Sequence, residues 1–267
     1  MTTDPFFAEH TGDAPLLISI PHGGTEVPGD IAAGLTDRAL TLPDTDWHVA
    51  RLYDFARALG ANTIAARLSR YVIDLNRPSD GHSLYPGQAT TGLVPTTTFD
   101  GAPLHRAGQA PDAAEITRRV AAYWRPYHVA LEARLQTIRR RHGVALLWDA
   151  HSIRSRVPRL FEGRLPDFNL GSNGGASADR GLVTRVAAVA TAAKVYSSVL
   201  DGRFKGGHIT RAYGDPAQGI HAVQLELAQL TYMDEDPPFT YRPERAVRVQ
   251  RPIKAMLEAA LDWLAAA

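Results

Sequence analysis

The sequence contains no cysteine, which excludes disulfides, thiolate metal ligands and a cysteine nucleophile. The sequence also lacks an excess of one charge, because it contains 29 lysines and arginines and 28 acidic residues, which gives a net charge of +1. Such a balance gives no reason to expect a nucleic-acid or membrane partner. No apolar run approaches the roughly 18 residues of a membrane span, and the N-terminus has no signal-peptide pattern. We therefore expect a soluble, cytoplasmic protein.

Three common catalytic signatures are missing as well. The sequence has no Gly-x-Ser-x-Gly, no phosphate loop or dinucleotide fingerprint, and no His-Glu-x-x-His. These motifs would indicate a serine nucleophile, nucleotide binding and a helical zinc protease, respectively. All three mechanisms are set aside.

Short apolar runs alternate with long segments of helical periodicity, which favours an α/β fold. A chain of 267 residues without a linker or internal repeat fits one domain, residues 1–267. The patterns predict strands at Leu16–Ile20, Asn62–Ala66, Val72–Leu75, Ala145–Trp148, Val195–Val199 and Ala222–Leu227. They predict helices at Asp46–Leu59, Asp112–Arg141, Ala178–Ala193 and Arg245–Ala266. Pro126 should kink or divide the second of these helices.

Two long stretches lack periodicity and are rich in glycine and proline: residues 78–111 and residues 154–179. Connections of this length are uncommon inside a compact domain and often act as lids or binding loops. Both stretches follow predicted strand ends, so both can lie over the same crevice. A plain surface excursion is the alternative.

Two histidines stand at the ends of predicted strands. His151 follows an apolar run with Asp149 two residues before it, and His22 follows another run where Pro21 breaks the strand. The C-terminal ends of parallel strands face the crevice in which α/β enzymes bind ligands. The pair therefore indicates a metal site at one edge of the sheet, with Asp149 suited to orient His151. Each histidine alone is also compatible with a structural role.

A carboxylate should complete such a site, because catalytic zinc takes three protein ligands and a water. The candidates are Glu26, four residues after His22, and the neighbouring Asp44 and Asp46. Asp44 has the position of a helix N-cap, which leaves Asp46 free to point elsewhere. All three stay open on spacing alone, and such ligands also suit other divalent ions.

Other polar residues stand where they can serve catalysis or substrate binding. Asn76 and Arg77 end a predicted strand, where an arginine can bind a substrate carboxylate or steady an oxyanion; a strand-closing ion pair is the alternative. Glu226 is a charge in an otherwise apolar strand. Beside a metal it would act as general base, and otherwise it is a strand-edge carboxylate. The glycine-flanked segment around Arg211 predicts a substrate-binding loop, with His208 as a weaker ligand candidate.

Six segments together resemble the N-formylglutamate amidohydrolase family, and the resemblance runs from about Pro15 to Asp236. The segments are residues 18–28, 44–49, 71–78, 147–155, 204–211 and 223–227. The resemblance implies an α/β domain whose mixed, mostly parallel sheet is flanked by helices, similar to zinc carboxypeptidases and aspartoacylase. It also implies hydrolysis of N-formyl-L-glutamate to formate and L-glutamate in histidine degradation.

The resemblance further implies a divalent metal, with zinc as the expected ion. His22, Asp46 and His151 would hold it. Relatives of this fold separate their histidine and glutamate ligands by two residues, whereas His22 and Glu26 have three residues between them. This difference favours Asp46 over Glu26, while Asp44 stays open.

The resemblance also implies roles for the remaining candidates. Glu226 would take a proton from water and deliver it to the departing amine, and Arg77 would help stabilise the oxyanion. Asn76, Arg211 and Arg154 would hold the two substrate carboxylates. One alternative is the same chemistry on another N-acyl amino acid or a short peptide. The other is a non-catalytic protein that binds a small acidic ligand.

Overall fold

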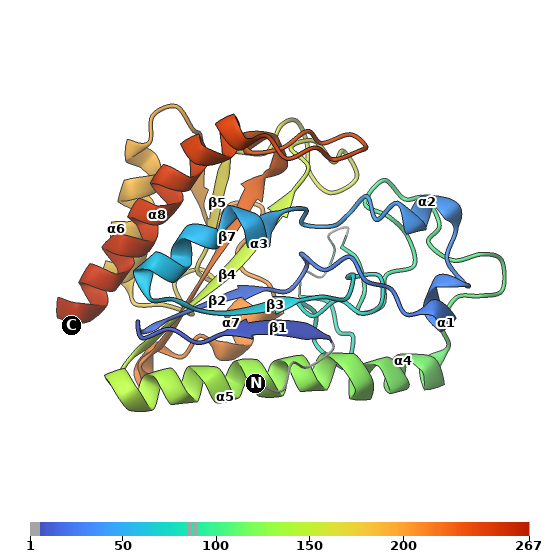
Figure 1. The fold of residues 1–267 in the computed structure, drawn as a ribbon, viewed down its shortest axis with the longest axis horizontal. Helices are drawn as coiled ribbons and strands as arrows, with labels where there is room; N and C mark the ends of the chain where they lie inside the picture. The colour runs from blue at the N-terminus through green and yellow to red at the C-terminus, as the bar shows by residue number, and fades with distance from the viewer. Residues whose placement is uncertain (1–5, 85–86, 88–89, 267) are drawn as a thin grey trace.

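The central element of the computed structural model is a seven-stranded sheet in the order β1-β3-β2-β4-β7-β5-β6 (Figure 1). The model describes residues 6–84, 87 and 90–266. The strands are β1 Phe7–His10, β2 Leu16–Ile20, β3 Asn62–Ala66, β4 Ala145–Ile153, β5 Phe168–Gly171, β6 Ser198–Leu200 and β7 Ile220–Ala228. The central four are parallel, while β1 at one edge and β5 and β6 at the other run in the opposite direction. The predicted mixed, mostly parallel sheet is confirmed.

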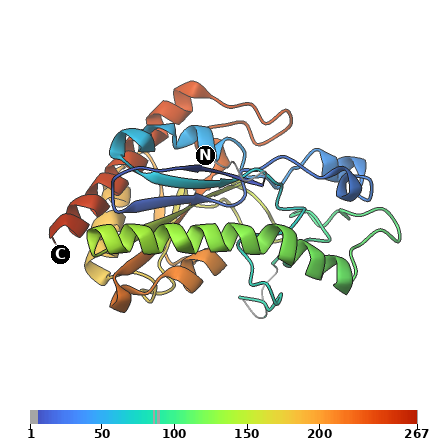
Figure 2. The ribbon, with the colours of Figure 1, turned by 60° about the horizontal axis from the view of Figure 1, so that its bottom comes forward.

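Helices cover both faces of the sheet. They are α1 Gly29–Ala32, α2 Asp37–Leu40, α3 Val49–Leu52, α4 Ala113–Arg119, α5 Arg125–His142, α6 Arg180–Ala192, α7 His208–Tyr213 and α8 Pro243–Ala266. Short 3₁₀ turns at Asp54–Leu59, Pro216–Gln218 and Gln229–Thr231 and a π-helical turn at Val120–Trp124 join them. Figure 2 shows α5 running along one face, with α8 beyond the sheet. None of the described helices is long and apolar enough to cross a bilayer.

The alternation of side chains along the strands divides the core into two layers. In β2, Leu16, Ile18 and Ile20 pack with α3, α6 and α8, whereas Leu17 packs with α5 and α7. Every residue of β2, β4 and β7 is buried. Strands covered on both faces read as continuous apolar runs, which is why they are visible in the sequence.

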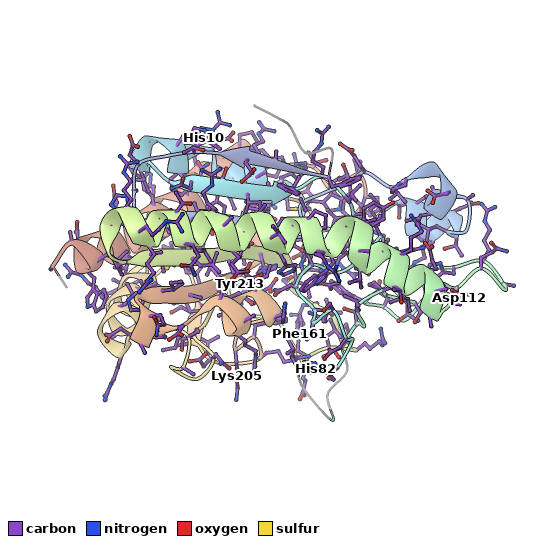
Figure 3. The ribbon with its side chains drawn as sticks, turned by 90° about the horizontal axis from the view of Figure 1, so that it is seen from below. His10, His82, Asp112, Phe161, Lys205 and Tyr213 are labelled. Carbon is purple, nitrogen blue, oxygen red and sulfur yellow. The ribbon has the colours of Figure 1, made fainter. Side chains whose placement is uncertain are left out.

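The predicted strand Val72–Leu75 is wrong, because these residues lie in a turn-rich segment outside the sheet. Its backbone carbonyls need donors, and the helical layer supplies them. Two side chains donate to this segment: Arg119 Nη1 to the Val72 carbonyl at 3.0 Å and His128 Nε2 to the Leu75 carbonyl at 2.9 Å. Just beyond it, Trp124 Nε1 donates to the Arg77 carbonyl at 2.9 Å. Seen from the α5 side in Figure 3, Tyr213 lies beside that helix, and its hydroxyl is 2.8 Å from His128 Nδ1.

The helix predicted at Asp46–Leu59 begins later and is shorter. It comprises α3, whose N-cap is His48 with a φ of 63°, followed by the 3₁₀ turn Asp54–Leu59. The predicted N-cap role of Asp44 is therefore wrong. The long helix is divided as expected, because the π-helical turn ends at Trp124 and Pro126 lies in the first turn of α5.

The stretch 154–179 is not structureless, because it contains β5, which pairs antiparallel with β7. The predicted strand Val195–Val199 appears as the shorter β6, and the predicted loop 206–214 contains α7. In the stretch 78–111, Tyr85, Pro86, Gln88 and Ala89 lie outside the described residues. The rest of that stretch contains no helix or strand.

Candidate active site

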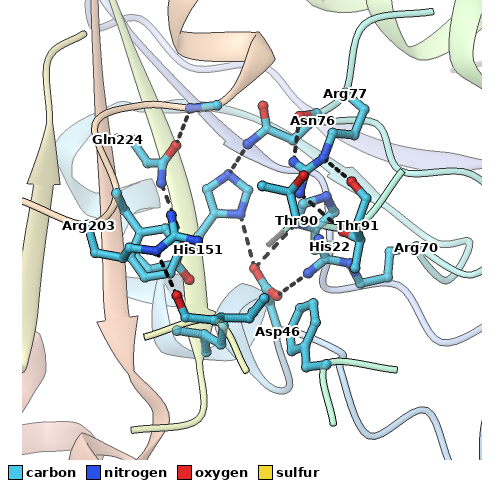
Figure 4. Close-up of a pocket in the computed structure, with 16 residues that line it drawn as sticks. His22, Asp46, Arg70, Asn76, Arg77, Thr90, Thr91, His151, Arg203 and Gln224 are labelled. Atoms are coloured by element: carbon cyan, nitrogen blue, oxygen red, sulfur yellow. Dashed lines mark hydrogen bonds and ion pairs between the residues drawn. The ribbon is translucent and has the colours of Figure 1, made fainter. Parts of the chain in front are cut away.

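A cavity opens where the parallel strands β2, β4 and β7 end (Figure 4). His22 lies two residues after the end of β2, His151 lies on β4, and Glu226 lies opposite His151 in the register of β7. Both long stretches contribute to the walls. The lining residues are His22, Asp46, Arg70, Asn76, Arg77, Thr90, Thr91, Phe99, His151, Ile153, Leu160, Arg203, Phe204, Gly207, Gln224 and Glu226.

Three buried side chains converge at the floor of this cavity. One ligand atom from each of His22, Asp46 and His151 lies within 4.8 Å of the others. Asp46 Oδ2 is 3.1 Å from His151 Nδ1 and 3.8 Å from His22 Nδ1. A backbone hydrogen bond joins the loop that carries Asp46 to the segment after β2: the Asp46 amide donates to the His22 carbonyl at 3.1 Å. Two nitrogens and one carboxylate oxygen suit a zinc-type site.

The outer nitrogen of each histidine faces a carboxylate. His22 Nε2 lies 2.7 Å from Asp74 Oδ1, and His151 Nε2 lies 3.1 Å from Asp149 Oδ2. With Nε2 of each ring turned toward a carboxylate, Nδ1 of each ring faces Asp46 and is the nitrogen available to an ion. Asp149 thus lies where the sequence placed it. Asp74 in turn accepts from Arg70 Nη2 at 2.7 Å.

The charges of the cluster also suit a cation. Burial alone would lower the pKa of His151, but Asp149 and Asp46 hold the pKa of this histidine well above its ordinary range. Burial would raise the pKa of Asp46, but His151 and His22 keep it below the ordinary aspartate value. The buried carboxylates therefore attract positive charge to this point. His22, Asp46 and His151 can hold a metal ion.

The other two carboxylate candidates are engaged elsewhere. Asp44 Oδ2 accepts from the Tyr71 hydroxyl at 2.7 Å and from the Phe99 amide at 2.8 Å. Glu26 is 54% exposed and pairs with Arg67 at 3.1 Å. Among the described residues, Asp46 is the carboxylate that joins the two histidines.

Glu226 faces the same cavity from β7. Its Oε2 accepts from Gln224 Nε2 at 3.3 Å, and Gln224 Oε1 accepts from the Gly207 amide at 2.7 Å. Burial raises the pKa of Glu226 to about 8. A carboxylate with such a pKa is suited to accept and return a proton near neutral pH.

The remaining predicted residues divide into two groups. Asn76 and Arg77 line the cavity: Asn76 Nδ2 is 2.9 Å from His151 Nε2, and Arg77 Nε donates to the Thr91 carbonyl at 2.8 Å. Arg154 and Arg211 are not among the residues that line it. Arg154 donates to Asp100 at 2.9 Å, and Arg211 donates to the Gly206 carbonyl at 2.9 Å.

His208 is not part of the described metal-type cluster. Its ring lies 5.6 Å from that of Trp124 and 5.4 Å from that of His128.

Sequence reasoning missed Arg70, Gln224 and Arg203, all of which line the cavity. Gln224 had a usable signal, because it stands two residues before Glu226 and so projects from the same face of β7. Arg70 and Arg203 lie in irregular segments. No local pattern distinguishes them from surface arginines.

A mostly parallel α/β sheet with a His-Asp-His cluster and a buried glutamate at its strand ends is typical of metal-assisted hydrolases. The family model for N-formylglutamate amidohydrolase matches residues 14–233. The chain therefore belongs to this family.

Curated relatives and a solved structure agree with this assignment. The chain is 59% identical to the N-formylglutamate deformylase of Pseudomonas aeruginosa over 252 residues, and this alignment covers 94% of each of the two chains. It is 56% identical over 260 residues to that of Pseudomonas putida, covering 97% of each. The crystal structure of the N-formylglutamate amidohydrolase from Ralstonia eutropha JMP134 superimposes with a TM-score of 0.82 at 26% identity, covering 98% of both chains.

Proposed function

We propose that this chain hydrolyses N-formyl-L-glutamate to formate and L-glutamate. The observation that carries the proposal is the buried His22–Asp46–His151 cluster in one cavity with Glu226. Arginines in the same walls suit a substrate with two carboxylates. The near full-length identity to proteins named N-formylglutamate deformylase supports the choice of substrate.

In this proposal, His22, Asp46 and His151 hold a divalent ion, and their donor set favours zinc. When bound, such an ion supplies a Lewis acid that activates water and polarises the formyl carbonyl. The carboxylates of Asp74 and Asp149 keep the two imidazoles oriented from behind.

Glu226 is the proposed general base and acid. Its carboxylate accepts a proton as the water oxygen bonds to the formyl carbon. The carbon–nitrogen bond then breaks, and Glu226 delivers the proton to the departing amine, so that formate and glutamate leave. Burial keeps the proton affinity of this carboxylate high enough for the second transfer.

The cationic and amide side chains of the site have proposed roles in binding and stabilisation. Arg77 steadies the oxyanion that forms on the formyl oxygen. Asn76 binds a substrate carboxylate from the cavity wall. Arg211 and Arg154 are proposed as further carboxylate contacts, which requires their segments to approach the substrate. The stretches 78–111 and 154–179 are accordingly proposed as active-site loops.

The direct test is glutamate release from N-formyl-L-glutamate by purified protein, before and after chelation and after zinc is added back. We expect activity to disappear with chelator and to return with zinc. Full activity without metal would refute the metal-dependent mechanism but not the substrate. A lack of activity with metal restored would refute the substrate, and a panel of N-acetyl amino acids and dipeptides would then test the related hydrolase activities. Subcellular fractionation tests the cytoplasmic location, which also belongs to this proposal.

A further inference from the structure

Three arginines line the cavity: Arg70, Arg77 and Arg203. Arg70 is committed to the carboxylates behind the cluster, because its guanidinium lies 2.7 Å from Asp74 and 3.6 Å from Asp46. Arg77 belongs to the polar wall that Thr91 and Asn76 form. Arg203 has no role in the proposed function, although it lines the cavity and the arginines proposed there as carboxylate contacts, Arg154 and Arg211, do not.

Arg203 lies in the segment between β6 and α7, on another side of the cavity. Figure 4 shows Arg203 and Arg77 on opposite sides of His151. Arg203 Nε donates to the Leu160 carbonyl at 2.9 Å, and its guanidinium carbon is 5.3 Å from the centre of the Phe204 ring. These two contacts hold the guanidinium against one wall of the cavity.

The wall beside Arg203 is apolar. Ile153, Leu160 and Phe204 line the cavity there and belong to one hydrophobic cluster. Such a surface suits the two methylene groups of a glutamyl side chain, and a cation at its edge suits the carboxylate at the end of that side chain. The opposite wall offers Thr91, Asn76 and Arg77 and is polar.

We propose that Arg203 binds the side-chain carboxylate of the substrate and sets the preference for acidic over neutral side chains. This inference rests on the proposed function and adds a specificity-determining residue to it. The methylenes of the substrate lie along Ile153, Leu160 and Phe204. Because its tether to Leu160 already restricts the Arg203 side chain, binding orders it at a reduced entropic cost.

The test compares N-formyl-L-glutamate with the isosteric neutral N-formyl-L-glutamine. Arg203→Gln should lower kcat/KM for the glutamate substrate by about 10- to 100-fold, mainly through KM, because a charge-assisted hydrogen bond is lost. For the glutamine substrate the change should stay within about twofold, as at a position without a specific contact. Arg203→Lys should retain part of the preference for the glutamate substrate, since lysine keeps the positive charge but cannot donate two parallel hydrogen bonds to one carboxylate. Arg140→Gln, at an exposed arginine on α5, is the matched control.

A second readout does not depend on turnover. In a Glu226→Gln background, calorimetry should show that Arg203→Gln raises the Kd for N-formyl-L-glutamate but not for N-formyl-L-glutamine. An equal loss for both substrates, or no loss, would overturn the inference and leave the proposed reaction intact. If metal-replete protein with Glu226 intact shows charge-selective, Arg203-dependent binding but does not turn over N-formyl-L-glutamate, the inference is supported and the proposed reaction is refuted. If Arg203→Gln does not fold, Arg203→Lys decides by the same comparison.

Discussion

Replacing Glu226 by glutamine tests both the chemistry and the electrostatics of the site. Glutamine keeps the shape of the side chain but cannot accept and return a proton. Removing a general acid–base group costs about two to four orders of magnitude in rate. We therefore expect Glu226→Gln to lose that much in kcat while elemental analysis finds its metal content unchanged. Turnover near the wild-type rate would remove Glu226 from the proposed role.

The same substitution should stabilise the metal-free protein, and the gain should depend on pH. Burial raises the pKa of Glu226 from 4.5 to about 8. Below pH 4.5 the carboxyl is protonated in both the folded and the unfolded chain, so it makes no difference to stability. As the pH rises toward 8, only the unfolded chain releases the proton, and the free energy of unfolding falls. Each tenfold difference in proton affinity corresponds to about 1.4 kcal/mol, so the cost approaches about 5 kcal/mol above pH 8.

Thermal melts of chelated wild-type protein and Glu226→Gln at pH 5, 6, 7 and 8 measure this effect. The advantage of the variant should be small at pH 5 and should grow to several degrees at pH 8. Glu132→Gln, at an exposed glutamate on α5, is the control and should follow the wild type at every pH. A difference that does not change between pH 5 and pH 8 would show that the pKa of Glu226 is not raised in the folded chain.

Three other substitutions test separate parts of the site. Asp46→Ala should lose bound metal by elemental analysis, and metal retained at the wild-type level would return the third ligand to Asp44 or Glu26. Trp124→Phe removes the donor to the Arg77 carbonyl and should lower kcat by about 2- to 10-fold, the value of one hydrogen bond, at normal metal content. An unchanged kcat would show that this contact does not position Arg77. Arg211→Ala should raise KM and leave kcat unchanged, whereas a loss confined to kcat would exclude its role as a ground-state anchor.

The sequence predicted the parts of the fold whose signals are local. The strands Leu16–Ile20 and Asn62–Ala66 have the predicted bounds. A strand buried on both faces has a continuous apolar sequence and a strand buried on one face has an alternating one, so both kinds can be recognised from the sequence. Val72–Leu75 carries the same kind of pattern but does not pair. Its carbonyls are satisfied by side chains that lie about 50 residues further along the chain. β5, with four residues, is too short for a period to be seen.

The candidate site likewise contains residues that local sequence signals predict and residues that they do not. His22 and His151 could be placed together because strand ends share one edge of a parallel sheet. The choice of Asp46 over Asp44 could not be made from spacing, since it depends on Tyr71 and Phe99 occupying Asp44. Arg203 depends on a contact with Leu160, which lies in a different irregular segment. Contacts between irregular segments leave no period in a sequence.

The cavity is surrounded by buried carboxylates that do not favour the stability of the fold. Asp46, Asp74, Asp149 and Glu226 are buried close to one another, and Arg70 pairs with two of them, Asp46 and Asp74. A fold selected only for stability would replace such a group with apolar side chains, because each buried carboxylate costs desolvation. The divalent cation proposed for the His22–Asp46–His151 cluster would offset that cost. This arrangement of buried charges therefore supports the proposed cation site rather than a set of purely structural ion pairs.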